Sequence, residues 1–181
     1  MKIIGLNGSL RTRSLNRNLL QAAGDCFSES VDFQALSLGD IPLYNQDLDG
    51  DNPPAAVAAL KRAVSEADGL LLATPEYNFG MSGVLKNAID WLSRPAFNSP
   101  LTGKATTIIT ASMSPLGGVR AQEDCRRVLH GTHSPVMGGF EYLLGSAHQA
   151  FDDSGRLTDE DAKRRLQRHI EQFEHWVGQQ P

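Results

Sequence analysis

The sequence predicts an α/β fold, a doubly wound five-stranded parallel sheet with helices on both faces. Short apolar segments alternate with amphipathic segments of helical period along the whole chain, and such alternation is typical of parallel sheets. The 181 residues contain no internal repeat, linker or low-complexity tract. A chain of this length has the size of one domain. We therefore expect a single domain over residues 1–181.

In the first half of the chain, three strands enclose two helices. Lys2–Asn7 is a short apolar run that predicts a buried strand. Ser14 can cap a helix, and Val31–Leu36 alternates apolar and polar residues as a strand does. Asn52–Pro54 predicts a second helix start, because proline at the first turn loses no needed hydrogen bond. Gly69–Thr74 is apolar enough for a strand buried on both faces. The two expected inward stripes are Leu15, Leu19, Ala22 and Cys26, and then Val57, Leu60, Val64 and Ala67.

The second half continues the alternation. Gly83–Ser93 has helical periodicity, and Lys104–Thr110 is rich in β-branched residues, which favours a strand. A helix then extends to about Leu129, and the fifth strand is expected near Pro135–Gly139. A capping-box pattern over Thr158–Asp161 predicts the start of the last helix. The two expected inward stripes are Leu85, Ile89 and Leu92, and then Ala162, Leu166, Ile170, Phe173 and Val177.

Composition excludes several classes of protein. The net charge is −4, and the 17 Lys and Arg residues are scattered, which argues against a dedicated nucleic-acid partner. The densest apolar run, Leu70–Ala73, is far shorter than the roughly 20 residues that a membrane span needs, and the N-terminal run is too short for a signal peptide. The two cysteines, Cys26 and Cys125, are far apart in the chain and indicate buried thiols in a reducing cytoplasm.

The loop over residues 8–16 has the features of an anion site. It leads from the first strand to a helix N-terminus, where free N–H groups and the helix dipole favour negative charge. Ser9, Ser14 and Asn16 can donate hydrogen bonds, and Arg11 can supply a charged contact. The spacing matches neither the P-loop nor the GxGxxG turn. The alternative is an ordinary capped helix start with solvated arginines.

Two further loops follow the third and fourth strands, and in such a sheet all three loops lie at the ligand-binding edge. Residues 74–83 contain Tyr77 and Phe79, on which a flat heteroaromatic ring can stack. Residues 110–118 end in two glycines, which let the backbone approach a ligand closely. Taken singly, each loop is equally a structural turn. Together with the anion loop they indicate a mononucleotide with a large ring.

The strings GSLRTRSLN, residues 8–16, and PEYNFGMSGVLKNAIDWLSRP, residues 75–95, resemble the NADPH-dependent FMN reductase family. That family includes the chromate and quinone reductases of bacteria and has a flavodoxin-like fold. The resemblance extends from the first strand to the loop after the fourth, and the C-terminal third matches only in layout. Two departures lie beside the expected flavin face: Ser82 stands where many relatives have proline, and Phe79-Gly80 replaces the common Tyr-Ser. They bear on substrate preference more than on flavin binding.

The resemblance implies an FMN-dependent NAD(P)H oxidoreductase that works by a ping-pong mechanism. NADPH or NADH reduces the flavin, which then passes electrons to quinones, chromate, azo compounds, ferric chelates or free flavin. No catalytic side chain is expected, since the cofactor supplies the chemistry. The residues implied to bind the cofactor are Ser9, Arg11, Ser14, Leu15 and Asn16 for the phosphate, Pro75, Glu76, Tyr77, Asn78, Phe79 and Gly80 for the ring, and Ser112, Gly117 and Gly118 in the third loop.

Other functions are weighed against this one. A flavodoxin-type electron carrier is the alternative, although carriers are typically more acidic and have no arginine in the phosphate loop. Glu76 is either a general base or, as we favour, a local structural anchor. His130, His133 and Cys125 do not have the spacing of a zinc site, and no metal is expected.

The sequence also bears on the donor and on assembly. Arg13, Arg17 and Arg120 are candidates for the 2′-phosphate of NADPH, or are simply solvated. In the family the flavin lies near a dimer interface, so a homodimer or homotetramer is expected. The family helix matched by Val84–Arg94 often makes subunit contacts. Trp91, Leu92 and Pro95 are its candidate contact residues, and the alternative is that Trp91 is merely half-buried in the monomer.

Overall fold

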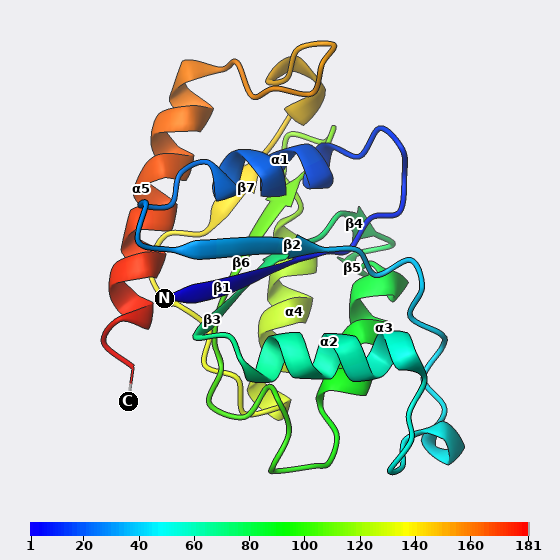
Figure 1. The fold of residues 1–181 in the computed structure, drawn as a ribbon. Helices are drawn as coiled ribbons and strands as arrows, with labels where there is room; N and C mark the ends of the chain where they lie inside the picture. The colour runs from blue at the N-terminus through cyan, green and yellow to red at the C-terminus, as the bar shows by residue number, and fades with distance from the viewer. Residues whose placement is uncertain (181) are drawn as a thin grey trace.

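Five parallel strands form the central sheet of the computed structural model, which describes residues 1–180 (Figure 1). The strands are β1 (Lys2–Asn7), β2 (Asp32–Leu36), β3 (Gly69–Ala73), β6 (Ala105–Ala111) and β7 (Tyr142–Leu144). Their order across the sheet is β2-β1-β3-β6-β7. The chain thus builds outwards on both sides of β1 and β3, which is the flavodoxin-like order. The predicted fold class is confirmed.

Helices cover both faces of this sheet (Figure 1). They are α1 (Leu15–Gly24), α2 (Ala55–Ser65), α3 (Gly83–Leu92), α4 (Val119–Gly131) and α5 (Glu160–Val177). Helices α1 and α5 pack on the face that presents Ile3 and Leu71. Helices α2, α3 and α4 pack on the opposite face, which presents Ile4 and Leu70. Neighbouring strand residues point to opposite faces, so an uninterrupted apolar strand supplies both cores.

Shorter elements connect these. They are the two-residue strands β4 (Glu76–Tyr77) and β5 (Gly80–Met81) and the 3₁₀ turns η1 (Gln46–Leu48) and η2 (Ala147–Gln149).

The two cysteine thiols are not joined in a disulfide and have low reactivity. Burial is the main cause that raises the pKa of Cys125 to about 12 and that of the half-buried Cys26 to about 11. A thiol with such a pKa has little thiolate character at neutral pH.

The prediction of the fifth strand at Pro135–Gly139 is wrong in position. Val136 forms only an isolated bridge with Thr106, and the strand proper is β7, whose Tyr142 pairs with Ile109. Proline has no N–H for a ladder, and Gly139 has φ +95°, which ends the extended backbone. The chain therefore touches the start of β6, leaves it, and pairs with its end.

The predicted start of the last helix is also shifted by one residue. Asp159, not Thr158, is the N-cap, and its carboxylate accepts a 2.7 Å hydrogen bond from the N–H of Ala162. Thr158 is held elsewhere, because its N–H donates to the carbonyl of Ala150 at 2.8 Å. The carboxylate of the N-cap and the acidic residues of the first turn both stabilise the helix, because their negative charges lie at the positive end of the helix dipole.

This capping arrangement predicts a measurable stability difference. Asp159→Ala is expected to lower the free energy of unfolding by about 1 kcal/mol, because it leaves a first-turn N–H without its acceptor. Urea unfolding of the variant measures the loss. Thr158→Ala is the matched control and should cost clearly less. An equal or larger loss in the control would restore the original capping assignment.

Candidate functional site

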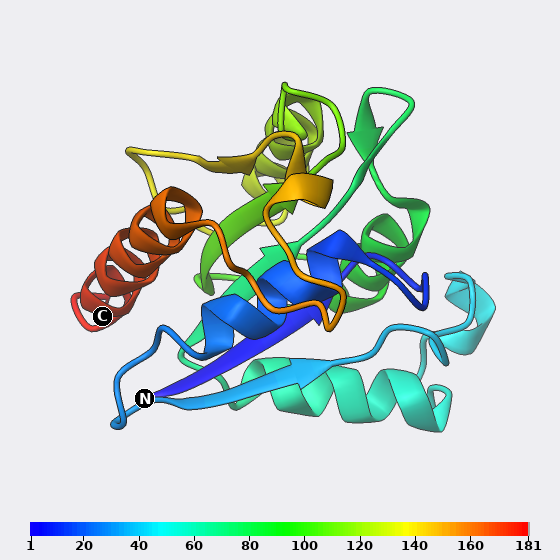
Figure 2. The ribbon, with the colours of Figure 1, turned by 90° about the horizontal axis from the view of Figure 1, so that it is seen from above.

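Three loops meet beyond the carboxyl ends of β1, β3 and β6, where the fold predicts a ligand (Figure 2). Between them lies a cavity of about 180 Å³. Its lining residues are Ser9, Arg11, Ser14, Leu15, Asn16, Pro75, Glu76, Tyr77, Ala111, Ser112 and Met113. The structure thus brings together predicted residues from all three loops. Of the residues predicted for the ring and the third loop, Asn78, Phe79, Gly80, Gly117 and Gly118 do not line the cavity.

Two lining residues, Ala111 and Met113, were not predicted. Both flank the predicted Ser112 at the point where β6 ends. Ala111 is the last residue of the strand, and Met113 is exposed in the loop beyond it. Their position at the carboxyl end of a central parallel strand is the signal that identifies them, since ligands bind there in this class of sheet.

The loop after β1 is fixed by short-range hydrogen bonds. The Asn7 amide donates to the carbonyl of Ser9 at 2.9 Å, and the N–H of Ser9 donates back to Asn7 at 3.2 Å. Gly8 has no room for a side chain, because a Cβ atom would lie 2.8 Å from Ser82 Oγ. The loop is therefore held against β3 and the start of α3.

The first turn of α1 presents free donors to the cavity. Ser14 caps the helix by accepting from the N–H of Arg17 at 3.1 Å, while the N–H groups of Leu15 and Asn16 have no acceptor within the helix. The hydroxyl groups of Ser9 and Ser14 are both available as donors in the lining. Arg11 is exposed, and no carboxylate among the described residues pairs with it. This donor set fits a phosphate group.

Asn16 plays a different part from the one expected of its side chain. The amide is buried and makes two 2.8 Å hydrogen bonds with Ala111, donating to its carbonyl and accepting from its N–H. The side chain therefore fastens α1 to the end of β6. The backbone N–H of Asn16 can still donate to an anion. The side-chain amide cannot, because it is already bonded to Ala111.

The loop after β3 contains a hairpin that the sequence did not reveal. Strands β4 and β5 pair through a tight turn at Asn78 and Phe79, whose φ angles are +50° and +67°. Both values lie in the left-handed region, as in a type I′ turn. Asparagine is common there, and phenylalanine is not. The turn holds the Phe79 ring out of the fold, with 71% of the residue exposed.

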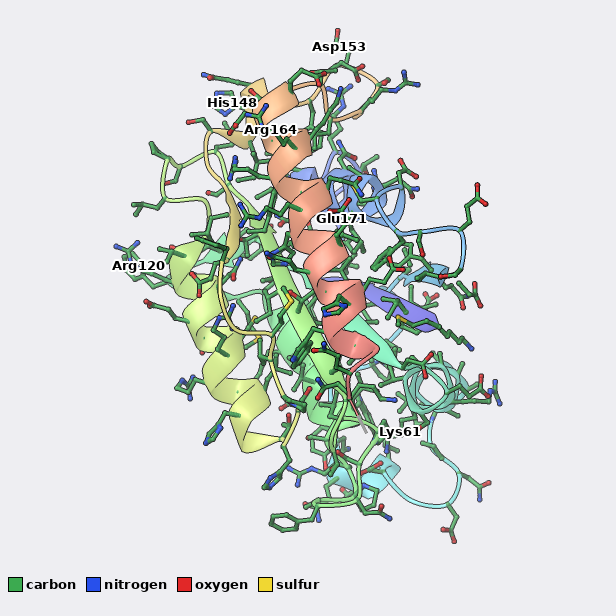
Figure 3. All side chains as sticks on the ribbon, turned by 90° about the vertical axis from the view of Figure 1, so that its left-hand side faces the viewer. Lys61, Arg120, His148, Asp153, Arg164 and Glu171 are labelled. Atoms are coloured by element: carbon green, nitrogen blue, oxygen red, sulfur yellow. The ribbon has the colours of Figure 1, made fainter. Side chains whose placement is uncertain are left out.

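Glu76 anchors this hairpin to α4. Its carboxylate accepts a 3.0 Å hydrogen bond from the backbone N–H of Arg120, in the first turn of α4, and pairs with the Arg120 guanidinium at 3.4 Å. The helix has glycine, Gly118, at its N-cap, so Glu76 supplies the acceptor that a cap residue would give. Arg120 lies at the N-terminal end of α4 (Figure 3), and its guanidinium covers the Phe79 ring at 4.6 Å.

The anchoring role predicts that Glu76→Gln leaves turnover nearly unchanged. The glutamine oxygen can still accept from Arg120, and no proton transfer depends on the side chain. Steady-state NAD(P)H oxidation should show kcat within about threefold of the parent. Loss of a general base would instead lower kcat by about 10²–10⁴. Glu123→Gln, an exposed change on α4 outside the cavity lining, is the matched control.

The three arginines considered for the NADPH 2′-phosphate differ in surroundings. Arg120 pairs with Glu76, and Arg17 donates to the carbonyl of Thr12. Arg13 is exposed, with no carboxylate partner in residues 1–180. Of the three, only Arg13 could bind a phosphate without first giving up a contact within residues 1–180.

Both glycines of the third loop are required by packing within the protein. Gly117 and Gly118 have φ +64° and +90°. A Cβ atom would lie 2.9 Å from Leu143 in the first case and 2.9 Å from Thr110 in the second. The loop can lie flat on β6 and β7 only without these side chains. The two glycines therefore position the third loop and do not themselves line the cavity.

Two of the three expected subunit-contact residues are wrongly assigned. Trp91 and Leu92 are fully buried within the chain. The Trp91 indole donates to the carbonyl of Pro42 at 2.8 Å and packs edge-on against Tyr44 at 4.9 Å. Leu92 lies in the inward stripe that the sequence predicts for this helix. Trp91 is covered by the loop around Pro42, and the sequence of that loop has no apolar periodicity that would place it there. Pro95 is exposed.

Residues 1–180 have neither a cluster of metal ligands nor a helix that could cross a membrane. No group of three or more His, Cys, Asp or Glu side chains is placed to hold a metal ion. No helix in this part of the chain is both long enough and apolar enough to span a bilayer.

The chain is similar to known flavin enzymes over nearly its whole length. A family model described as NADPH-dependent FMN reductase matches residues 1–149. An NAD(P)H-dependent FMN reductase of Pseudomonas aeruginosa is 39% identical over 177 residues, 98% of this chain and 95% of the relative. A 2-hydroxy-1,4-benzoquinone reductase of a Burkholderia species is 37% identical over 177 residues, 98% and 96% of the two chains. The structure of FerB, a flavoenzyme NAD(P)H:(acceptor) oxidoreductase of Paracoccus denitrificans, has a TM-score of 0.90 and 32% identity, covering 99% and 98%.

Proposed function

The chain belongs to the NADPH-dependent FMN reductase family, and on this premise we propose that it reduces quinones at the cavity between the three loops. It is an FMN-dependent NAD(P)H oxidoreductase. The observation that carries the assignment of the site is the donor set around the first turn of α1, which is open to an anion and lies beside the aromatic hairpin. When bound, FMN supplies the electron-transfer chemistry that amino-acid side chains lack.

The residues of the first loop would hold the phosphate. Ser9 and Ser14 donate through their hydroxyl groups, and Leu15 and Asn16 donate through backbone N–H groups in the first turn of the helix. Arg11 adds a charge-assisted contact. The fold sets two of these donors in place, because Ser14 is fixed as the N-cap and Asn16 is fastened to Ala111.

The second and third loops would receive the flavin ring. Pro75, Tyr77 and Ser112 line the same cavity as the phosphate donors. Phe79 lies outside the lining, at the tip of the hairpin, and Glu76 and Arg120 keep the hairpin in position. Tyr77 and Phe79 are both exposed on the hairpin, and the ring of Tyr77, which lines the cavity, offers a surface on which a flat donor or acceptor can stack. A quinone is a flat, polar ring that can stack in this way, which supports a quinone as the acceptor.

We further propose that the enzyme is a homodimer or homotetramer. Phe79, Met113 and Leu116 are large apolar residues exposed in the loops around the cavity, and exposed apolar patches mark interaction sites. A second copy would cover them. Sedimentation velocity of the FMN-loaded protein tests this, and a monomer at micromolar concentration would contradict it. The two cysteines are free thiols, which supports the cytoplasm as the enzyme's location.

Steady-state kinetics test the proposed reaction. NADH and NADPH are each oxidised with 1,4-benzoquinone, chromate or ferricyanide as acceptor, and FMN is kept saturating. We expect the highest kcat/KM with benzoquinone and parallel double-reciprocal lines, which indicate a ping-pong order of events. Converging lines would contradict the ping-pong proposal. FMN binding without steady-state NAD(P)H oxidation would instead favour an electron carrier.

A further inference from the structure

The hairpin of β4 and β5 carries Tyr77 but has little structure of its own to hold that residue in place. Each strand has two residues, and the two strands pair with one another and not with the central sheet. A lone two-stranded hairpin is at best marginally stable in water. Helix α4 contacts both strands. The position of Tyr77 in the cavity lining therefore depends on how the hairpin is fastened to α4.

Asp124, on α4, contacts β5 directly. Its Oδ2 atom accepts a 3.1 Å hydrogen bond from the backbone N–H of Met81. Its Oδ1 atom accepts from the exposed Arg127 guanidinium at 2.6 Å. Asp124 lies one helical turn after Arg120, whose backbone N–H donates to Glu76. The hairpin and the helix thus exchange two carboxylate contacts, one in each direction.

The strand register links Asp124 to the cavity. Tyr77 pairs with Gly80 across the hairpin, and Glu76 pairs with Met81. The Glu76 contact therefore fixes the strand that contains Tyr77, and the Asp124 contact fixes the strand opposite. Met81 is also the residue through which the hairpin enters the core, because its side chain is buried. Both contacts are needed to hold the Tyr77 side of the hairpin in one position.

Gly80 leaves the room that the Asp124 contact needs. A Cβ atom at position 80 would lie 3.1 Å from Asp124 Oδ2, so the carboxylate would have to move from its place beside the Met81 N–H. The φ angle of Gly80 is not in the left-handed region, so the demand for glycine comes from space and not from the backbone. This glycine stands where the family commonly has serine. Gly80 and Asp124 therefore form a matched pair.

We propose that Asp124 is a positioning residue of the reductase that keeps the Tyr77 ring at the cavity, where flat acceptors stack. Asp124 does not line the cavity and acts only through β5. This role rests on the proposed reduction of quinones. Without the contact, β5 can move away from α4, and the stacking surface moves with it. A flat acceptor then binds more weakly, whereas an acceptor that does not stack is unaffected.

Steady-state kinetics of the FMN-loaded enzyme test this role, with NADPH as donor and FMN kept saturating for each variant. 1,4-Benzoquinone is the flat acceptor, and ferricyanide, an octahedral ion that cannot stack, is its control. Asp124→Ala removes the contact, and Asp124→Asn keeps an oxygen that accepts from the Met81 N–H. Arg127→Ala is the matched control, because it removes the other partner of the same carboxylate. Both side chains reach solvent, so the variants should fold.

We expect Asp124→Ala to raise the KM for benzoquinone by about fivefold or more, as the loss of one hydrogen bond allows. Its kcat and the KM for ferricyanide should stay close to those of the parent. Asp124→Asn and Arg127→Ala should behave as the parent does with both acceptors. An unchanged KM for benzoquinone in Asp124→Ala would overturn the proposal. So would an equal rise for the two acceptors, which indicates a general loss of structure.

Gly80→Ala tests the matched pair independently. The added Cβ displaces the carboxylate, so this variant should also raise the KM for benzoquinone. In the Asp124→Ala background the same change should have no further effect, because the contact is already lost. Equal effects of Gly80→Ala in the two backgrounds, or no effect in the parent, would contradict the pairing.

Amide hydrogen exchange separates this inference from the proposed function. With FMN added, the Met81 amide should exchange about fivefold faster or more in Asp124→Ala than in Arg127→Ala, because it has lost its acceptor. If neither acceptor supports NADPH oxidation by the parent, the proposed function fails and the acceptor role fails with it. The exchange rates still decide whether Asp124 holds β5. Equal exchange of Met81 in the two variants would overturn that contact.

Discussion

Asn16→Ala is expected to lower the free energy of unfolding by about 2–6 kcal/mol, because the buried Asn16 side chain, in the first turn of α1, holds two backbone groups of a distant strand. The Asn16 amide makes two 2.8 Å hydrogen bonds with the backbone of Ala111. Its loss leaves a buried N–H and a buried carbonyl unpaired, at a cost of about 1–3 kcal/mol each. Urea unfolding of the FMN-free protein measures the effect without contribution from ligand binding.

Asn18→Ala is the matched control for this change. Asn18 lies half a turn further along α1, and its side chain makes no hydrogen bond within residues 1–180. The control should lower the free energy of unfolding clearly less, because the half-buried Asn18 side chain lies beside Gly155 and its removal leaves no backbone group unpaired. FMN affinity should also fall in Asn16→Ala, because the side chain fastens the phosphate loop to the third loop. A loss of stability no greater than that of the control would contradict the clamp.

Arg11→Ala is expected to weaken FMN binding by about 1.5–3 kcal/mol, the cost of losing a hydrogen bond to a charged group. This corresponds to roughly a 10- to 150-fold rise in the Kd for FMN. Arg11 lines the cavity beside the first turn of α1, and no carboxylate in residues 1–180 competes for it. Quenching of flavin fluorescence during a titration gives the affinity.

Arg13→Ala separates a local contact from a general effect of charge. Arg13 is in the same loop and carries the same charge, but it does not line the cavity. Its replacement should change the FMN affinity less than about threefold, and the gap between the two variants should persist at 0.5 M salt, where long-range attraction is screened. Equal affinities for Arg11→Ala and the parent protein would remove Arg11 from the phosphate site.

The sequence predicted the parts of this protein that depend on local pattern. The buried strands β1 and β3 are largely apolar runs, and β6 is rich in β-branched residues, which are strong signals of a buried strand. The loops that follow them were located because parallel strands end at a common edge. The donors Ser9, Arg11 and Ser14 were predicted in this way, and the structure places them in one cavity.

The features that the sequence did not reveal depend on contacts between distant segments. Asn16 reads as a free polar residue, and only the fold shows that it lies against Ala111. The hairpin at Phe79 contradicts the usual preference of phenylalanine for negative φ. Trp91 is buried by the loop around Pro42, whose position is set by tertiary packing.

We propose that FMN binds between the three loops and accepts electrons there from a nicotinamide. The decisive test is an anaerobic absorption spectrum of the purified protein with added FMN, recorded before and after NADPH. We predict that the flavin bands shift on binding and bleach promptly with NADPH, and that both changes need more FMN in Arg11→Ala than in Arg13→Ala. A spectrum of free FMN in the presence of the protein would contradict the site. Bound flavin that neither NADPH nor NADH reduces would contradict the reaction.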